Sequence, residues 1–545
     1  MKMTHLKKYL APRLLIPLLL LPNLAFSAQT LNIAIIQEWS TFNPVTSQLA
    51  SNEALFPLIL RRMVMRKADG SVIPDVAESV PKLQKNKTAL WKIRKNAKWA
   101  DGSAITCADW HLGWQVGSSP NVSVESRELY SKISRIDWTD KNPQHCTVTY
   151  TSSNWSYDRD LPPLIPAKSE DAIFKKHQTQ SEGYDRNTAY ISTPTNRALY
   201  NGPYYVSEFK LGQSVILTRN EHFYGPRPQV DRIIIKHIAD TSSLKAHLAS
   251  GQINAISAVG FPPDTALLLH EEFQKKSSDL KVVFQDSSIF QGLYFNLQSE
   301  VFKDARVREA LSRAIDKNQI VKAFFGGQLQ PAESILPPQH PAYVKKQPIY
   351  SVSRANELLD QAGWVKSPQT GWREKNKKTL SFVFKTSAGL KVLENIQVYI
   401  CEQYKKIGAQ CLIKNEPPRV LLGQSVPRGE FDLAMYGQPI PPDSSLSSYF
   451  ASSSIPTAQN SWAGGNSIRL NSEKIDRWLK QFDSESDRKK RNDLIKKIEA
   501  HLKDEFALIP LYHRREAIVM PKNLQGLTPS YEGTGFNAPE NWSLQ

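Results

Sequence analysis

The stretch FKDARVREALSRAIDK, residues 302–317, decides the fold class of this chain. Asp304 is a good N-cap residue, so a helix is expected to begin at Ala305. Its apolar residues recur at helical spacing and fall on one face, namely Val307, Ala310, Leu311, Ala314 and Ile315. Asp316 followed by Gln319 resembles a second capping box, so we predict that the helix breaks there and restarts. Gly326 ends it.

Strand and helix patterns lie on both sides of this segment. Residues 31–36 are rich in β-branched side chains and predict a buried strand, and the polar and aromatic loop 37–44 follows its C-terminal end, where ligands gather in open α/β sheets. Residues 63–199 differ, with short strands, tryptophans and Pro-rich loops. Further expected strands are 215–218, 233–235 and 506–512, and further expected helices are 354–362, 390–407, 473–482 and 487–502. Together these patterns predict an α/β protein.

The N-terminal residues are typical of an export signal. Lys2, Lys7, Lys8 and Arg13 precede an apolar run over 14–24, and Ala25-Phe26-Ser27 offers small residues for cleavage. We therefore predict a signal peptide over residues 1–27, cleaved before Ala28. The alternative, an uncleaved membrane anchor, needs about 20 apolar residues, and this run is shorter.

The charge of the chain is positive. The formal net charge is +17, and it becomes +13 without the four cations of residues 1–27. Such an excess can attract nucleic acid, anionic lipid or acidic substrates. Because the lysines are scattered among acidic residues, a solvated basic surface is the simpler interpretation.

The four cysteines predict two disulfides. Cys401 lies in an expected helix that ends near Gly408, and Cys411 lies in the strand that follows. The helix rises about 9 Å over six residues, and three residues of strand return roughly 10 Å, so the two sulfurs can meet. Export to an oxidising compartment favours this bond and a second one between Cys107 and Cys146. The competing interpretation is a zinc site, formed by Cys107, His111, His145 and Cys146.

Signatures of common enzyme classes are absent from the sequence. It contains no G-x-S-x-G nucleophile elbow, no H-E-x-x-H zinc motif, and no Gly-Lys pair of a phosphate-binding loop. This census favours a binding protein over an enzyme, and it gives no reason to expect a cofactor.

Several motifs resemble those of the peptide-binding family of solute-binding proteins that serve importers. The most specific is the stretch 302–317 itself. Similar to the family's other signatures are KWADGSAIT at 98–106 (with Ala104 where proline is usual), NGPYYV at 201–206, TRNEHFYG at 218–225, ANELLDQAGW at 355–364 and IPLY at 509–512. The matches occur in family order from about residue 90 to 525.

The resemblance implies a two-lobed periplasmic-binding-protein fold of class II type with an additional small domain. Lobe I would combine residues 28–62, 200–285 and 508–545, with the small domain 63–199 inserted in it. Lobe II would be 286–507. The chain would cross between lobes twice, which suits a hinge.

The resemblance also implies the function. The protein would be a periplasmic monomer, not an enzyme, that captures a peptide-like ligand between its lobes and delivers it to an inner-membrane ABC permease, with no nucleic-acid partner. Main-chain hydrogen bonds would hold the ligand, and water would fill the gaps beside varied side chains. The expected ligand-binding residues are Trp39, Ser40, Thr41, Tyr436, Gly437, Gln438, Asp443 and Tyr512.

One departure from the family pattern concerns the ligand's amine. Relatives that bind free peptides often carry an Asp shortly after a Gly-Trp pair. Here Gln438 replaces that Trp, prolines follow it, and Asp443 aligns with a later, structural Asp. The departure leaves room for other ligands that the family binds, such as nickel complexes, haem, sugars or murein fragments. The remaining alternative is a secreted hydrolase acting on peptides or glycans.

Overall fold

The structure is a computed structural model. It describes residues 29–39, 41–47, 50–67, 71–84, 87–124, 127–152, 155–238, 240, 243–259, 261, 263–338, 340–344, 350–441, 444–460, 462, 464–485, 487–527, 536 and 538–545. The predicted signal peptide and its cleavage site therefore lie outside the described residues. No helix in the described part of the chain has the length and apolar character needed to span a membrane.

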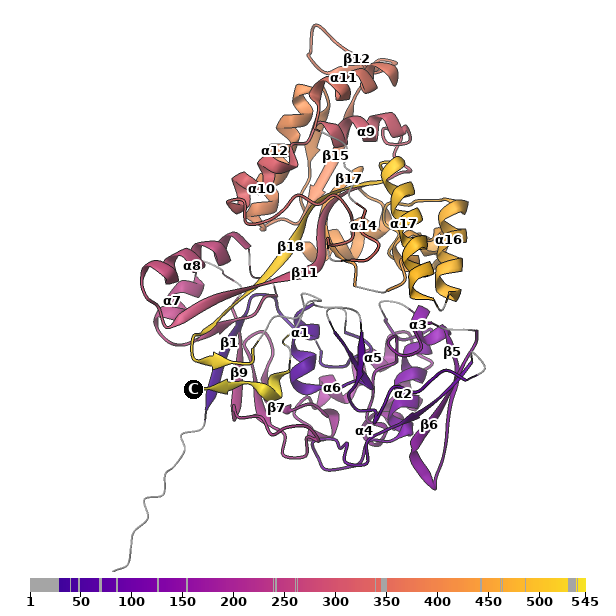
Figure 1. Ribbon diagram of the computed structural model, residues 1–545, viewed down its shortest axis with the longest axis vertical. Helices are drawn as coiled ribbons and strands as arrows, with labels where there is room; N and C mark the ends of the chain where they lie inside the picture. Colours follow the sequence, from indigo (N-terminus) through magenta and orange to yellow (C-terminus); the bar gives the residue numbers. More distant parts are fainter. Residues whose placement is uncertain are drawn as a thin grey trace, which may run out of the picture.

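One ten-stranded sheet runs through the whole molecule, in the order β16-β15-β17-β11-β18-β10-β1-β9-β8-β7. Figure 1 shows helices on both of its halves, one half in the lower lobe and one in the upper. The molecule is thus an α/β protein with two lobes, as the sequence predicts.

Lobe I is built around the first strand of the sheet. β1 (Thr30–Ile35) pairs in parallel with β9 (Arg232–His237) and β10 (Ala255–Ile256), and it has core on both sides because Ile33 and Ile35 pack in one hydrophobic cluster and Ala34 packs in another. The other elements of this lobe are β7 (Tyr204–Lys210), β8 (Ser214–Arg219), β19 (Leu524–Gln525), β20 (Ser543–Leu544), α1 (Ala50–Ile59), α7 (Leu244–Ala249) and α8 (Pro263–Lys275).

Lobe II contains the segment from which the fold was predicted. Asp304 caps α9 (Ala305–Arg313) and Asp316 caps α10 (Lys317–Phe325) by accepting a hydrogen bond from the Gln319 backbone at 3.0 Å, so the predicted break is confirmed. The other elements are α11 (Val352–Gln361), α12 (Lys391–Lys406), α13 (Pro418–Val420), α14 (Val426–Arg428), α15 (Ser447–Phe450), α16 (Glu473–Ser484), α17 (Arg488–Asp504), β12 (Val365–Lys366), β13 (Arg373–Lys375), β14 (Lys378–Thr379), β15 (Ser381–Thr386), β16 (Gln410–Ile413) and β17 (Leu433–Pro439).

A small domain accompanies lobe I. Its antiparallel sheet β4-β6-β5 packs against α2 around buried tryptophans. Its elements are β2 (Val64–Arg66), β3 (Val72–Pro74), β4 (Thr88–Lys92), β5 (Ile133–Thr139), β6 (Asn142–Tyr150), α2 (Cys107–Ser118), α3 (Glu128–Ser131), α4 (Ala167–His177), α5 (Gly183–Asn187) and α6 (Ala189–Ser192). Side chains of α2 and α4 also belong to the lobe I core, which ties the two units together.

Two long antiparallel strands connect the lobes. β11 (Leu280–Phe295) and β18 (Leu508–Pro521) pair along most of their lengths and rise together from the lower to the upper lobe in Figure 1. The sequence predicts only residues 506–512 of β18 and none of β11. The missed portions contain polar residues, which interrupt the apolar pattern by which a strand is recognised.

Both predicted disulfides are present. Cys107 at the start of α2 bonds Cys146 in β6, and Cys401 in α12 bonds Cys411 in β16. The alternative zinc site is wrong, because the first disulfide uses both thiols that would have held the metal. Among the described residues, no cluster of His, Cys, Asp and Glu is arranged to hold a metal ion.

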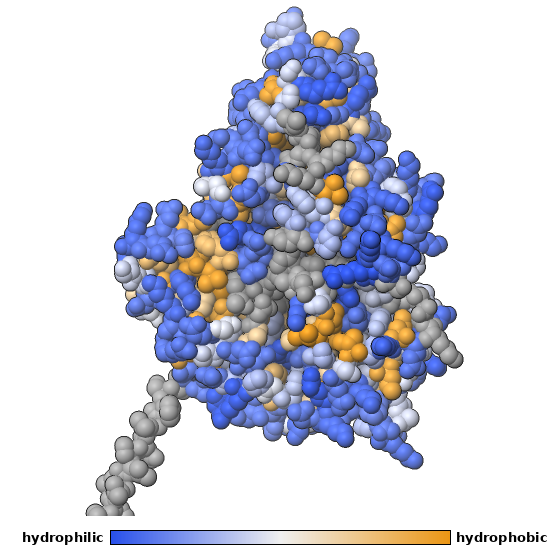
Figure 2. All heavy atoms as spheres, in the orientation of Figure 1, coloured by the Kyte–Doolittle hydropathy of each residue, from blue (hydrophilic) through white to orange (hydrophobic). Residues whose placement is uncertain are grey.

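The surface in Figure 2 is mostly hydrophilic, in keeping with scattered charged residues. Apolar side chains gather over α7 and α8, where Leu268 is 60% exposed.

Candidate ligand-binding site

The β11–β18 ladder is interrupted where the strands pass from one lobe to the other. Asp286 pairs with Arg515 and Phe290 pairs with His513, so Arg514 and the three residues 287–289 have no partner in the ladder. Such a bulge bends a strand and re-aims its side chains. The end of β17 joins this bulge, because the Ile440 backbone donates a hydrogen bond to the Ser288 carbonyl at 3.0 Å.

Polar side chains converge on Gly437 in β17. A Cβ atom on this residue would lie 3.1 Å from Cγ2 of Ile289, 3.3 Å from Nη1 of Arg514 and 3.3 Å from Oε1 of Gln291. Both polar side chains therefore approach the same point, and only glycine leaves that point open. Gln291 is 2% exposed, and its buried Nε2 has no hydrogen-bond partner among the described residues.

Arg514 is paired with a buried acid. Its Nε lies 3.3 Å from Oε1 of Glu516, and the Glu516 side chain is only 4% exposed. Burial raises the pKa of Glu516, and the positive charge of Arg514 partly offsets this effect. Alternation along β18 places Glu516 on the same face as Ile518 and Met520, which pack in the core that contains Trp39.

The described residues predicted on β17 and β18 lie on neighbouring strands. Gly437 pairs with Gln291, Gln438 with Phe290, and Tyr512 with Gln291, so β17, β11 and β18 bring them together. The side chain of Tyr436 is engaged within lobe II: its ring stacks on Tyr294 at 3.9 Å and its hydroxyl bonds Ser467. Burial raises its pKa. Asp443 lies outside the described residues.

The predicted residues of lobe I follow β1. Trp39 is 1% exposed, its ring lies edge-on to His237 at 6.0 Å, and its buried Nε1 has no hydrogen-bond partner in the described part of the chain. Thr41 is buried, and its Oγ1 accepts a hydrogen bond from the Asn43 backbone at 3.2 Å. Ser40 lies outside the described residues.

The lobes also touch at a second place, which we call the rim contact, defined by Trp155, Phe482, Arg491, Lys132 and Asp483. Trp155 of the small domain packs in a lobe II core. Its ring meets Phe482 of α16 edge-on at 5.1 Å, and the guanidinium of Arg491 in α17 lies over it at 4.1 Å. Arg491 is itself buried, so the cation–π attraction is strengthened by desolvation.

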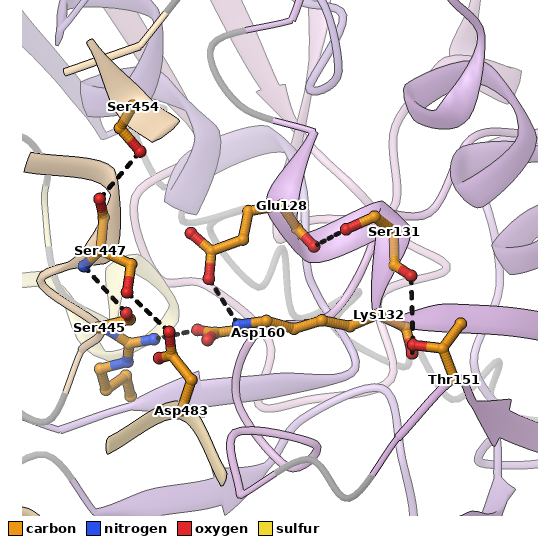
Figure 3. Close-up of polar contacts among 10 residues, drawn as sticks. Glu128, Ser131, Lys132, Thr151, Asp160, Ser445, Ser447, Ser454 and Asp483 are labelled. Carbon is orange, nitrogen blue, oxygen red and sulfur yellow. Dashed lines mark hydrogen bonds and ion pairs between the residues drawn. The ribbon is translucent and has the colours of Figure 1, made fainter. Parts of the chain in front are cut away.

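Charged groups extend the rim contact (Figure 3). Lys132 bonds Glu128 at 2.8 Å, and the carboxylates of Asp160 and Asp483 lie beside its ammonium group. Burial alone would lower the pKa of Lys132, but these three carboxylates outweigh burial and raise it. Asp160 is also paired with Arg66 at 3.0 Å, and Asp483 accepts a hydrogen bond from the Ser447 hydroxyl at 2.6 Å. Lys132 and Asp483 thus bring opposite charges from the small domain and lobe II together.

The family model of the bacterial extracellular solute-binding proteins, family 5, matches residues 71–457. The chain belongs to this family. The oligopeptide-binding protein AppA of Bacillus subtilis is 27% identical to it over 475 residues, covering 86% of this chain and 83% of AppA. OppA of Lactococcus lactis subsp. cremoris is 24% identical over 375 residues, covering 61% of this chain and 59% of OppA.

Solved structures of similar fold extend the comparison of this family 5 protein. AppA of Bacillus subtilis in complex with a nonapeptide superposes with a TM-score of 0.81 at 24% identity, covering 95% of this chain and all of AppA. NikZ of Campylobacter jejuni in complex with Ni(L-His) superposes with a TM-score of 0.79 at 25% identity, covering 94% and 99% of the two chains. Family 5 members are solute-binding components of ABC importers and not enzymes, and they act outside the cytoplasmic membrane.

Sequence reasoning missed several polar residues of this family 5 protein at the crossing of the lobes. Arg514 and Glu516 interrupt an otherwise apolar strand, and Ser287, Ser288 and Gln291 do the same in β11. The sequence signal that could have found them is a run of polar residues that interrupts an apolar strand without alternating between polar and apolar positions.

Proposed function

We propose that this family 5 protein captures a peptide or peptide-like ligand between its two lobes and delivers it to an ABC permease of the inner membrane. The observation that carries the proposal is a group of buried polar atoms without hydrogen-bond partners among the described residues, at the point where β11 and β18 pass between the lobes: Oγ of Ser288, Nε2 of Gln291 and Oε1 of Glu516. Leaving such atoms without partners costs roughly 1–3 kcal/mol each. A ligand with backbone carbonyls and amides can supply the missing partners.

The binding residues that we propose are those predicted from the sequence: Trp39, Ser40, Thr41, Tyr436, Gly437, Gln438, Asp443 and Tyr512. The proposed protein is a periplasmic monomer whose signal peptide is removed before Ala28, and its lobes divide at the boundaries given above. Two lobes joined by paired strands support a hinge that closes over the ligand.

A nickel complex is the second candidate ligand. The NikZ complex with Ni(L-His) has nearly the same fold similarity as the AppA complex with a nonapeptide. The replacement of the Gly-Trp pair by Gly437-Gln438 favours this candidate, because the acidic partner of a peptide amine is missing from the segment that follows.

Native and denaturing mass spectrometry of the purified mature protein test the proposal. We expect one small ligand per protein molecule, released on denaturation, and a rise in melting temperature when refolded, empty protein is given pentapeptide pools. If repeated preparations are empty and no pool shifts the melting temperature, the peptide assignment is wrong. A shift with nickel and histidine alone would support the second candidate.

A pair of glycine substitutions locates the site. Gly437→Leu fills the point that Arg514 and Gln291 approach, so it should abolish the shift in melting temperature. Gly423→Leu is the matched control, because no atom lies within 4 Å of the Cβ that it adds. Equal binding by both variants would contradict the proposed position of the ligand.

A further inference from the structure

The guanidinium of Arg514 has hydrogen-bonding capacity that the protein does not use. An arginine carries five N–H donors in a planar fork. In the described part of the chain, the only polar partner of Arg514 is Oε1 of Glu516, which faces Nε. The two terminal nitrogens therefore remain available, and Nη1 lies beside the backbone of Gly437.

Glu516 lies beside this fork. Its buried Oε1 is 3.3 Å from Nε without accepting a hydrogen bond, and the positive charge of Arg514 partly offsets the effect of burial on the pKa of Glu516. The Arg514 side chain is 29% exposed whereas that of Glu516 is 4% exposed, so the arginine is the member of the pair that solvent or a ligand can reach. A rigid fork with free terminal N–H groups matches the geometry of a carboxylate.

A second buried donor lies in the same region. Nε2 of Gln291 has no acceptor among the described residues. The atom of this amide that lies 3.3 Å from the point approached by Nη1 of Arg514 is the acceptor Oε1. In addition, a cation beside Gly437 repels an ammonium group, in the region where relatives place an acidic anchor for the peptide amine.

We propose that Arg514 binds a carboxylate of the ligand at the crossing of the lobes. The inference rests on the proposed function and deepens it, because it selects ligands by a negative group and not by a free amine. The carboxylate can be the C-terminus of a peptide or an acidic side chain. Arg514 is thereby the residue that determines specificity for a negative group.

Four synthetic pentapeptide pools test this inference by calorimetry on the full mature protein. Three share one composition free of Asp and Glu: one has free ends, one is amidated at the C-terminus, and one is acetylated at the N-terminus. The fourth is amidated and differs from these by a single Glu in each peptide. We expect amidation to weaken binding at least tenfold and acetylation to change it less than threefold. Recovery in the fourth pool would assign the contact to an acidic side chain, and no recovery would assign it to the C-terminus.

Variants assign the effect to Arg514. Arg514→Met keeps the aliphatic stem and should bind the free and amidated pools equally, at the affinity of the amidated pool. Arg514→Lys should restore part of the preference. Arg515→Met is the matched control: Arg515 lies over Phe284 and pairs with exposed Asp286 on the other side of the strand, so its removal should leave the preference intact.

Three outcomes would overturn the inference. Equal binding of free and amidated pools by the unmodified protein would leave the proposed function standing and remove the carboxylate contact. If only the N-acetylated pool failed to bind, the result would indicate that Glu516 binds the N-terminal ammonium group of the peptide instead. Failure of every pool to bind would overturn the peptide function and the inference with it.

Discussion

The two lobes are joined at two places, the hinge strands β11 and β18 and the rim contact, and different types of interaction hold them together at each place. At the hinge, β11 and β18 pair from Leu280 to Tyr294 with two register shifts, one between Asp286 and Phe290 and one between Gln291 and Gly292. At the rim, the described contacts join side chains: a tryptophan against a phenylalanine and an arginine, and a lysine beside an aspartate. Backbone pairing persists through motion of the lobes, whereas side-chain contacts of this type form and break.

The difference indicates which forces act during closure. In the proposed closure, the hinge strands would keep the lobes connected and bend at the register shifts, while the rim contact would contribute a modest energy that favours the closed arrangement. An aromatic pair contributes about 0.5–1.5 kcal/mol, and a cation–π contact contributes about 0.5–2 kcal/mol. Such energies shift a population without locking it. Four substitutions can break or sharpen this comparison.

Phe290→Ala at the hinge should have the largest effect. Phe290 is fully buried and lies between Gln438 and His513, so its truncation should lower the free energy of unfolding by about 3–4 kcal/mol. Urea denaturation measures this loss. Leu268→Ala on the exposed part of α8 is the control, with an expected change below about 0.5 kcal/mol. A similar loss in both variants would remove the special role of the hinge.

His513→Gln should change the pH dependence of stability. Burial lowers the pKa of His513 to about 4, below its unfolded value near 6.5. Its contribution is therefore fully present above pH 6.5 and is lost as the pH falls toward 4, which costs about 3 kcal/mol. Asp109, whose pKa burial raises to about 6, acts in the opposite direction in the same range.

Comparing the variant with the unmodified protein separates the effect of His513 from the pH dependence of the other titratable groups. The difference in unfolding free energy between the variant and the unmodified protein should move by about 2 kcal/mol between pH 7 and pH 4.5. Leu268→Ala, which removes no titratable group, is the control and should show a constant difference. A constant difference for His513→Gln as well would show that protonation of the hinge does not limit stability.

Trp155→Ala at the rim should act on closure more than on folding. Loss of the contacts with Phe482 and Arg491 should weaken the apparent affinity for the bound ligand about tenfold, because fewer molecules occupy the closed form. Small-angle scattering should report a larger radius of gyration for the ligand-free variant. Trp138→Ala, beside His111 within the small domain, should change neither quantity. An unchanged affinity for Trp155→Ala would contradict the role of the rim.

Lys132→Met should have the smallest effect. Removing the ammonium leaves Asp160 and Asp483 without this counter-charge and should weaken ligand affinity by about 0.5–1 kcal/mol. Titrations at 50 mM and 500 mM salt should show the effect shrinking as charges are screened. Lys168→Met is the control, because its partner Asp101 belongs to the small domain and not to lobe II. An effect that grows with salt would contradict an ionic contact.

Local patterns in the sequence predicted much of the fold. The break at Asp316 depends on one capping residue and its neighbours, and the Cys401–Cys411 bond depends on a helix and the next strand. By contrast, β11 and most of β18 were missed because Gln285–Ser288 and His513–Glu516 interrupt their apolar runs. Those interruptions occur where the strands leave one core and enter the next.

The candidate site was predictable only in part, for a related reason. Gly437 stood out through a family motif, but its neighbours Arg514 and Gln291 come from other strands and are brought to it by register. The pairing of Trp155 with Phe482 likewise depends on how two distant segments are placed, and neither residue has a local pattern that indicates the other.

The pairing of Phe290 with His513 has a consequence for the modularity of the chain. The chain enters lobe II along β11 and leaves it along β18, and these two strands pair with each other in one antiparallel ladder. The first and last strands of the chain, β1 and β20, both belong to lobe I. Lobe II is therefore an insertion into lobe I. Replacing it with a tight turn would join β11 to β18 as a hairpin, so that the remaining lobe keeps its sheet order and could be produced as an independent module.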